Sequence, residues 1–267
     1  MGLRYISLAI VLCLTATSGA VAQTKDRLDR RDKLLGFESV GLLQSATGSC
    51  TAALITRDVI LTAAHCVYEQ GKEFTFRAGY RDGTEIAARA AVDVVIAPGY
   101  TAARKAGDRP SAIKNDVALI RLDSPMFEVG INPYEITSQA RKGSALTVAS
   151  YGRGRMGALT LERGCILQKR YRGDVVGLDC DATFGSSGAP VFVHDQGRTR
   201  IFAVVAVRVN GDRADAETGA VELSKHVPAL MNTLRNNRAA APAIGGAKRI
   251  KVGQRSTSAA RFTKPGG

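Results

Sequence analysis

Residues 180–192 read CDATFGSSGAPVF, and they place two adjacent serines, Ser186 and Ser187, between glycines just ahead of an apolar run. A serine hydroxyl is a weak nucleophile at neutral pH. Serine-based chemistry therefore needs a neighbouring imidazole to take the proton and a carboxylate to orient that imidazole. The stretch has two interpretations, a glycine-rich turn or a nucleophile loop, and the choice depends on which partners the rest of the chain supplies.

The chain contains three histidines, which leaves few candidate bases. His65 lies in VILTAAHCV, where an apolar strand pattern ends and the small Ala63 and Ala64 leave room for other segments beside the ring. His194, in VFVHDQGR, and His226, ahead of a helical pattern, are more typical of surface or capping positions. His65 is therefore the favoured base.

Asp116 immediately precedes an apolar strand pattern in KNDVALIRL. A charge that enters an apolar run is costly unless it has a partner, so a buried acceptor for an imidazole N–H is one use of this residue. A turn at the start of the strand, formed by Asn115 and Asp116, explains the same residues equally well. On these residues alone, both interpretations remain open.

Together, LTAAHC, NDVALI and GSSGAP resemble the three signature blocks of the chymotrypsin-like (trypsin-fold) serine peptidases, particularly the secreted bacterial branch of glutamyl-endopeptidase-like and trypsin-like members. The chain order His, Asp, Ser is also that of this family, and it differs from the order in subtilisins and α/β-hydrolases. The resemblance covers about residues 38–238. It implies an all-β fold with two six-stranded antiparallel Greek-key β-barrels and a C-terminal α-helix.

The resemblance also implies a role for each motif residue. The family pattern G-x-S-G-x-P makes Ser187 the nucleophile, with His65 as general base and Asp116 as the carboxylate that orients it. The backbone N–H groups of Gly185 and Ser187 would form the oxyanion hole, and a side chain at 185 would crowd the substrate carbonyl. The implied activity is that of a serine endopeptidase acting on proteins or peptides, with no metal or organic cofactor. An esterase is a further option.

The nucleophile loop departs from the digestive enzymes of this family at Ser186. Those enzymes usually carry an aspartate there, and it pairs with a newly released N-terminal amine. The chain also has no IVGG-type N-terminus, so we expect other hydrogen bonds to hold the loop.

Asp181 stands six residues before Ser187, at the position that forms the base of the primary pocket in trypsin-like members. This position predicts a modest preference for basic P1 residues. The alternative is that Asp181 caps a turn beside Cys180. Arg208, in the predicted pocket-wall strand FAVVAVRVNG, would either neutralise Asp181 or attract an acidic side chain. Ala182 argues against a preference for acidic P1 residues, because glutamate-specific relatives commonly place a hydroxyl at this position.

With 267 residues, 45% of them hydrophobic, the chain can bury one large core or two small ones. Six β-branched or alternating runs precede the segment DSPMFEVGINPYEITSQARKG and six follow it, which favours two antiparallel barrels or a pair of sandwiches. Only HVPALMNTLRNNR predicts a helix. The expected divisions are a signal peptide (1–22), a charged leader or short propeptide (23–37), an N-terminal barrel (38–125), a linker (126–142), a C-terminal barrel (143–226), a helix (227–238) and a disordered basic tail (239–267).

The first 22 residues place Arg4 ahead of an apolar run that ends in small residues, which predicts a cleaved signal rather than a transmembrane anchor. Export to a secreted or periplasmic location favours disulfides among the cysteines that remain. Proximity favours the sequential pairing, in which each closed loop contributes about 3 kcal/mol. The expected pairs are Cys50 with Cys66 and Cys165 with Cys180.

The net charge of +13 is concentrated toward the end of the chain, where no acidic residue follows Glu222. We favour a solvated, disordered tail, and adhesion to anionic partners is the alternative. No specific nucleic-acid partner is indicated.

The rival to the enzyme is a catalytically silent trypsin-fold protein that adheres to anionic surfaces through this tail. Three intact catalytic residues disfavour that rival, because binding alone requires none of them.

Overall fold

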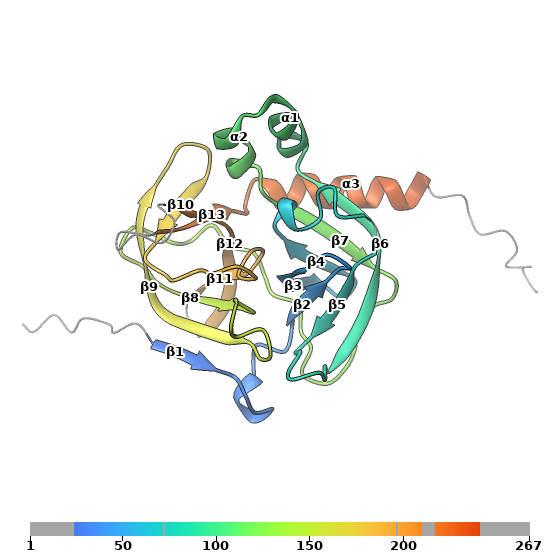
Figure 1. Cartoon of the computed structure of the whole chain (residues 1–267), viewed down its shortest axis with the longest axis vertical. Helices are drawn as coiled ribbons and strands as arrows, with labels where there is room; N and C mark the ends of the chain where they lie inside the picture. Colours follow the sequence, from blue (N-terminus) through green and yellow to red (C-terminus); the bar gives the residue numbers. More distant parts are fainter. Residues whose placement is uncertain (1–23, 72, 196, 210–216, 241–267) are drawn as a thin grey trace, which may run out of the picture.

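The computed structural model describes residues 24–71, 73–195, 197–209 and 217–240, and within them the chain forms two closed six-stranded antiparallel barrels (Figure 1). The all-β fold predicted from the sequence is confirmed. No helix in the described part is long and apolar enough to cross a membrane. The predicted signal peptide and the predicted tail beyond residue 240 lie outside the described residues.

The first barrel has the strand order β2-β3-β4-β7-β6-β5. Its strands are β2 (Val40–Gln44), β3 (Ser49–Thr56), β4 (Val59–Thr62), β5 (Thr75–Ala78), β6 (Ala87–Ile96) and β7 (Ala118–Leu122). The β-branched and aliphatic runs of the sequence fill its interior, where Leu54, Ile60 and Ile120 are fully buried. These side chains suit a pleated, half-buried surface, which is why the strands could be predicted from the sequence pattern.

The register of β4 against β7 positions two of the candidate site residues. Thr62, the last residue of β4, lies opposite Ala118, the first residue of β7. The chain just after β4 and the chain just before β7 therefore meet at the same end of the barrel. His65 lies in the first of these segments and Asp116 in the second.

The second barrel is closed by pairing of β8 with both β9 and β11. Its strands are β8 (Ala145–Ser150), β9 (Thr160–Arg170), β10 (Val175–Leu178), β11 (Pro190–Asp195), β12 (Arg198–Val209) and β13 (Glu217–Glu222). Leu167, Val191 and Phe202 are fully buried in its core. The loop that carries Ser186 and Ser187 leads directly into β11.

One apolar cluster spans both barrels and joins them. The ring of Tyr134, from the connecting segment, packs against Phe192 of β11 with ring centroids 4.7 Å apart. Tyr151, just after β8, is fully buried beside them. A backbone hydrogen bond of 2.9 Å from Thr51 N–H to Ser187 O ties β3 of the first barrel to the candidate nucleophile loop.

The C-terminal helix α3 (His226–Ala240) lies along β6 and β7 of the first barrel (Figure 1). Leu230 and Leu234 are buried, as their spacing on one helix face predicted. The expectation that this is the sole helix is wrong, because α1 (Pro98–Ala106) and α2 (Arg109–Lys114) lie between β6 and β7.

The end and start signals of the two additional helices were present in the sequence. Pro98 occupies the first turn of α1, and Gly107 ends that helix in a left-handed conformation. Asp108 caps α2 by accepting a hydrogen bond of 3.1 Å from the Ser111 N–H. Both helices are short, so their apolar periodicity was weak.

The charged leader predicted for residues 23–37 is partly built into the fold. Strand β1 (Thr24–Arg27) adds to the second barrel by antiparallel pairing with β9. Leu28 and Leu34 each have only 2% of their surface exposed. The charged residues around them face solvent, which allows a highly charged segment to bury its two leucines.

Candidate active site

His65 is held in a short 3-10 turn, η2 (Ala64–Cys66), directly after β4. The disulfide between Cys50 and Cys66 links this turn to β3. Ala63 and Ala64 are fully buried, so the turn packs closely against the barrel. The predicted sequential pairing is present at both bridges, with Cys165 joined to Cys180 in the second barrel.

Asp116 uses both of its carboxylate oxygens on His65. Its Oδ2 lies 2.6 Å from His65 Nδ1, and its Oδ1 accepts the His65 backbone N–H at 2.8 Å. An ionised carboxylate only accepts hydrogen bonds, so we assign the ring proton to Nδ1. Nε2 then carries the lone pair, which is the tautomer that a general base requires.

Asp116 is almost fully buried. The side chain of the adjacent Asn115 lies against Gly99 of helix α1, where a Cβ atom would be 2.7 Å from it. Burial raises the pKa of the Tyr100 phenol, on α1, to about 12, and the nearby Asp116 carboxylate adds to the rise. The ring of Tyr100 packs edge-on against Tyr68, two residues after Cys66. The helical insertion therefore lies near the Asp116 carboxylate.

The Ser187 loop packs directly against the turn that leads to His65. A Cβ atom on Gly188 would lie 2.2 Å from Thr62 Oγ1 and 3.0 Å from the Ala63 nitrogen, and the φ angle of +76° also favours glycine. Only glycine allows this approach.

The described hydrogen bonds join His65 to Asp116 but none joins His65 to Ser187. Such contacts are often long in unliganded enzymes.

Gly185 is required for a different reason from the one expected. Its φ angle is +89°, and a Cβ atom there would lie 2.3 Å from the Tyr151 carbonyl oxygen. Glycine is therefore needed because of the protein's own backbone, whereas the sequence suggested crowding of a substrate carbonyl. Nothing in the described residues accepts a hydrogen bond from the N–H of Gly185 or Ser187. Both groups remain available as donors.

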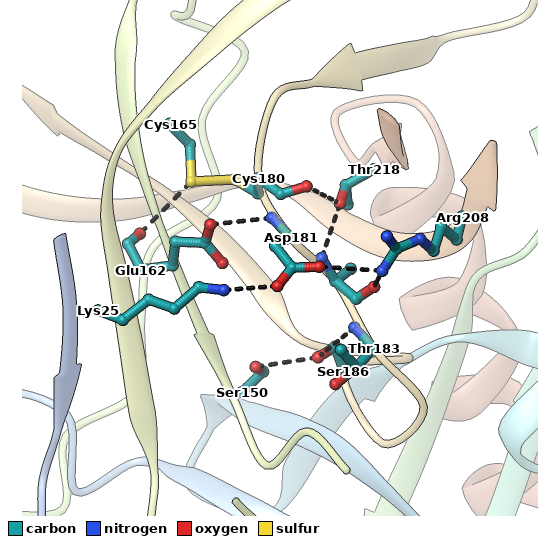
Figure 2. A network of polar contacts seen from close by, with 11 residues as sticks. Lys25, Ser150, Glu162, Cys165, Cys180, Asp181, Thr183, Ser186, Arg208 and Thr218 are labelled. Atoms are coloured by element: carbon teal, nitrogen blue, oxygen red, sulfur yellow. Dashed lines mark hydrogen bonds and ion pairs between the residues drawn. A yellow bond between two sulfur atoms is a disulfide. The ribbon is translucent and has the colours of Figure 1, made fainter. Parts of the chain in front are cut away.

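Side-chain hydroxyls hold the loop, as expected for a chain without the activating aspartate. Ser186 is 1% exposed; its Oγ donates to Ser150 Oγ at 3.1 Å and accepts the Thr183 N–H at 3.3 Å (Figure 2). Thr51 Oγ1 donates to the Gly185 carbonyl at 2.8 Å and accepts the Tyr151 N–H at 3.0 Å. Thr51 thus bridges the two barrels at the site.

We expect Thr51→Val to lower the free energy of unfolding by about 1–3 kcal/mol, because it leaves the buried Tyr151 N–H without an acceptor. The Gly185 carbonyl would also lose its donor, so activity at this site should fall with stability. Thr51→Ser keeps the hydroxyl and should stay close to the wild type in both respects. Denaturant unfolding of the three proteins measures the effect, and equal losses in the valine and serine variants would contradict the bridging role.

A cavity of about 630 Å³ adjoins Ser187. Its walls include Thr183, Phe184 and the strand residues Val205–Arg208. Three arginines also line it: Arg109 from α2, Arg153 from the loop after β8 and Arg208 from β12. Arg153 lies over the ring of Phe184, with its guanidinium carbon 4.2 Å from the ring centroid. Among the described lining residues there is no carboxylate, so the cavity is cationic.

Asp181 is not among the residues that line this cavity. Its Oδ2 lies 2.5 Å from Lys25 Nζ, and its Oδ1 lies 2.9 Å from Arg208 Nη1 (Figure 2). The Lys25 ammonium is the main cause that holds the Asp181 pKa below its usual value, and Arg208 adds to it. Arg208 contacts Asp181. Neutralisation of that carboxylate was one of the two roles predicted for Arg208.

The other histidines lie outside the site. His194 Nε2 is 3.1 Å from Thr147 Oγ1, and burial lowers the pKa of His194. Burial also lowers the pKa of His226, which begins α3. In the described part of the chain, the atoms grouped closely enough to hold a metal belong to His65 and the Cys50–Cys66 pair. The disulfide occupies both of those sulfurs.

Comparison with known proteins agrees with this geometry. The sequence model of the trypsin family matches residues 37–228. A search of the curated proteins finds no match. A solved structure of a Glu endopeptidase in complex with MPD is similar in fold, with a TM-score of 0.63 and 18% identity over 80% of this chain and 96% of that one. Since the family match spans both barrels and most of the sequence, the chain belongs to the trypsin family and is a serine-type endopeptidase.

Proposed function

We propose that this protein is exported and hydrolyses peptide bonds through an acyl-enzyme on Ser187, with His65 and Asp116 completing the triad. The observation that carries the proposal is the double contact of Asp116 with His65, because it leaves Nε2 as the basic nitrogen. The contact of Gly188 with the Thr62–Ala63 segment supports the approach of Ser187 to that nitrogen. The two disulfides favour an oxidising compartment, in agreement with the predicted signal peptide.

In the first step, Ser187 Oγ attacks the substrate carbonyl carbon while His65 Nε2 takes the hydroxyl proton. The developing oxyanion accepts hydrogen bonds from the N–H groups of Gly185 and Ser187. The C–N bond then breaks as His65 gives its proton to the leaving amine. Water attacks the resulting ester with His65 again as base, and collapse of the second tetrahedral intermediate releases the acid and restores Ser187. An activated ester would follow the same route, so esterase activity is an expected side activity.

The cavity beside Ser187 favours substrates with an acidic P1 side chain. Its three arginines would attract a carboxylate, and the described lining offers no carboxylate to attract a lysine or arginine. The predicted preference for basic P1 residues depended on Asp181 in the pocket, and the two ion pairs of Asp181 weaken that basis. The similar fold of a Glu endopeptidase is in line with an acidic preference.

Fluorophosphonate labelling of the folded protein tests the chemistry, since it separates an enzyme from a catalytically silent binder. Stoichiometric modification located on Ser187 by mass spectrometry supports the proposal. No modification of the folded protein would favour the binder that adheres to anionic surfaces, for which residues 239–267 would supply the basic segment.

Peptide profiling tests the specificity. We expect kcat/KM to be about tenfold or more higher with Glu at P1 than with Lys, because the charge of the side chain must match the cavity. Gln at P1 is the matched control for size and shape. A preference for Lys or Arg would instead restore Asp181 as the determinant.

A further inference from the structure

The N-terminal strand β1 is linked to the wall of the substrate cavity through one carboxylate, that of Asp181. In the pairing of β1 with β9, Lys25 lies opposite Glu162. The Lys25 ammonium extends from there to the Asp181 carboxylate, which also contacts Arg208 (Figure 2). Lys25 and Asp181 are 156 positions apart in the chain, so only the addition of β1 to the second barrel brings them together.

Arg208 connects this cluster to the cavity. Its Nη1 donates to Asp181 Oδ1 and to the Ala182 carbonyl oxygen, at 2.9 Å each, and both Arg208 and Ala182 line the cavity. The Asp181 backbone N–H donates to Glu162 Oε1 at 2.9 Å. The position of the Arg208 guanidinium is therefore coupled to Asp181, and Asp181 is shared with Lys25.

Four described groups of this cluster have formal charges that sum to zero when Lys25 is present. Lys25 and Arg208 are cations, and Asp181 and Glu162 are carboxylates. Without Lys25, these groups would carry one net negative charge beside the cavity. Lys25 and Asp181 have side chains 42% and 47% exposed, so the pair contributes little to folding stability. Its effect falls instead on the potential that a charged substrate side chain meets.

We propose that β1 is a retained part of the working enzyme and that Lys25 is a specificity-determining residue, which offsets the Asp181 carboxylate so that the cavity favours an acidic P1 side chain. This inference rests on the proposed function of the Ser187 site. It disagrees with the alternative that residues 23–37 are a propeptide that is removed. Cleavage after Arg27, Arg30 or Arg31 would separate Lys25 from the barrel and would make the cavity less favourable to acids.

The attachment of the leader supports its retention. Leu28 and Leu34 are buried in the main apolar cluster, and Leu28 N–H donates to Leu159 O at 2.8 Å. Arg31 donates to the Gly79 carbonyl at 3.1 Å, which ties the leader to the first barrel as well. A segment held at both barrels is a part of the fold, and its removal would expose apolar surface.

The test is the ratio of kcat/KM for two peptides that differ only in Glu or Gln at P1. We expect Lys25→Gln to lower this ratio by about threefold to tenfold, because one positive charge is lost close to the cavity. Lys33→Gln is the matched control. It removes a lysine of the same leader that pairs with Asp29 at 2.9 Å, outside this cluster, and it should leave the ratio unchanged.

A double-mutant cycle with Asp181→Asn shows whether Lys25 acts through Asp181. Once the carboxylate is gone, Lys25→Gln should change the ratio much less than in the wild type. An unchanged ratio in Lys25→Gln, or an equal fall in both backgrounds, would overturn the inference. Thermal unfolding of each variant confirms that the compared proteins are folded.

Two readouts separate this inference from the proposed function. A wild-type protein that hydrolyses neither peptide contradicts the proposed function. NMR titration still tests the cluster in that case, because Lys25→Gln should raise the Asp181 pKa, and an unmoved pKa overturns the inference. The mass of the active enzyme tests retention. A chain that begins before Lys25 supports it. An active chain that begins after Arg27 overturns it if its ratio of kcat/KM for the Glu and Gln peptides equals that of a chain containing Lys25.

Discussion

Ser187→Ala is expected to lower kcat for peptide hydrolysis by about a millionfold while the protein stays folded. The hydroxyl is the atom that forms the acyl bond, and no other side chain replaces it in that step. Ser187 is only half-buried beside the cavity, and its Oγ makes none of the described hydrogen bonds, so loss of this oxygen should hardly affect the loop. Steady-state kinetics on a cleavable peptide and fluorophosphonate labelling measure the effect, and thermal unfolding confirms the fold.

Ser186→Ala is the matched control for the adjacent serine. Its Oγ contacts Ser150 and the Thr183 N–H, so its loss should loosen the loop and reduce activity modestly, while labelling of Ser187 continues. The reverse pattern, with an active Ser187→Ala and an inactive Ser186→Ala, would mean that Ser186 is the nucleophile and would contradict the assignment to Ser187.

Asp116→Asn should lower kcat by about ten-thousandfold. Asp116 accepts hydrogen bonds from His65 through both oxygens, one to the backbone N–H and one to Nδ1. Asparagine has a single acceptor oxygen, so the amide NH₂ must face one of these donors. If it faces the ring, Nδ1 becomes the acceptor and the proton moves to Nε2, which then cannot take the proton of Ser187.

Asp108→Asn makes the same chemical change eight residues earlier. Asp108 caps α2 through the Ser111 N–H, and asparagine caps helices about as well, so activity and stability should stay near the wild type. Retention of more than about a tenth of the wild-type kcat in Asp116→Asn would contradict the orienting role, since such variants lose far more.

Much of the fold and of the candidate site could be predicted because the signals were local. Runs such as VILT and ALIRL formed strands β4 and β7, since β-branched and aliphatic side chains suit a pleated sheet with one face in the core. Cys50 and Cys66 paired, and so did Cys165 and Cys180, in part because short loops close at a low entropic cost. His65 was favoured by its position at the end of an apolar run, whereas Asp116 was assigned through the resemblance of its motif to the family. The structure places the two residues in contact.

The errors arose where local composition misled. Leu28 and Leu34 lie among charged residues and show no strand period, so their burial against the barrels could not be predicted from the leader itself. Helices α1 and α2 are brief, and their capping residues were stronger signals than their apolar pattern. Gly185 was identified correctly as a necessary glycine, but the atom that requires it, the Tyr151 carbonyl oxygen, belongs to a distant segment.

The sequence by itself determined the two strand-rich halves, their cysteine pairs and the three motifs, because each depends on neighbours within a few residues or on a short loop. The tertiary structure alone decided what surrounds the cavity. The partners of Asp181 are Lys25 and Arg208, and which charges meet there depends on the registers of β1 with β9 and of β12 within the second barrel. Electrostatic attraction falls with distance in space and not with separation along the chain, so the character of this pocket could be read only from the folded molecule.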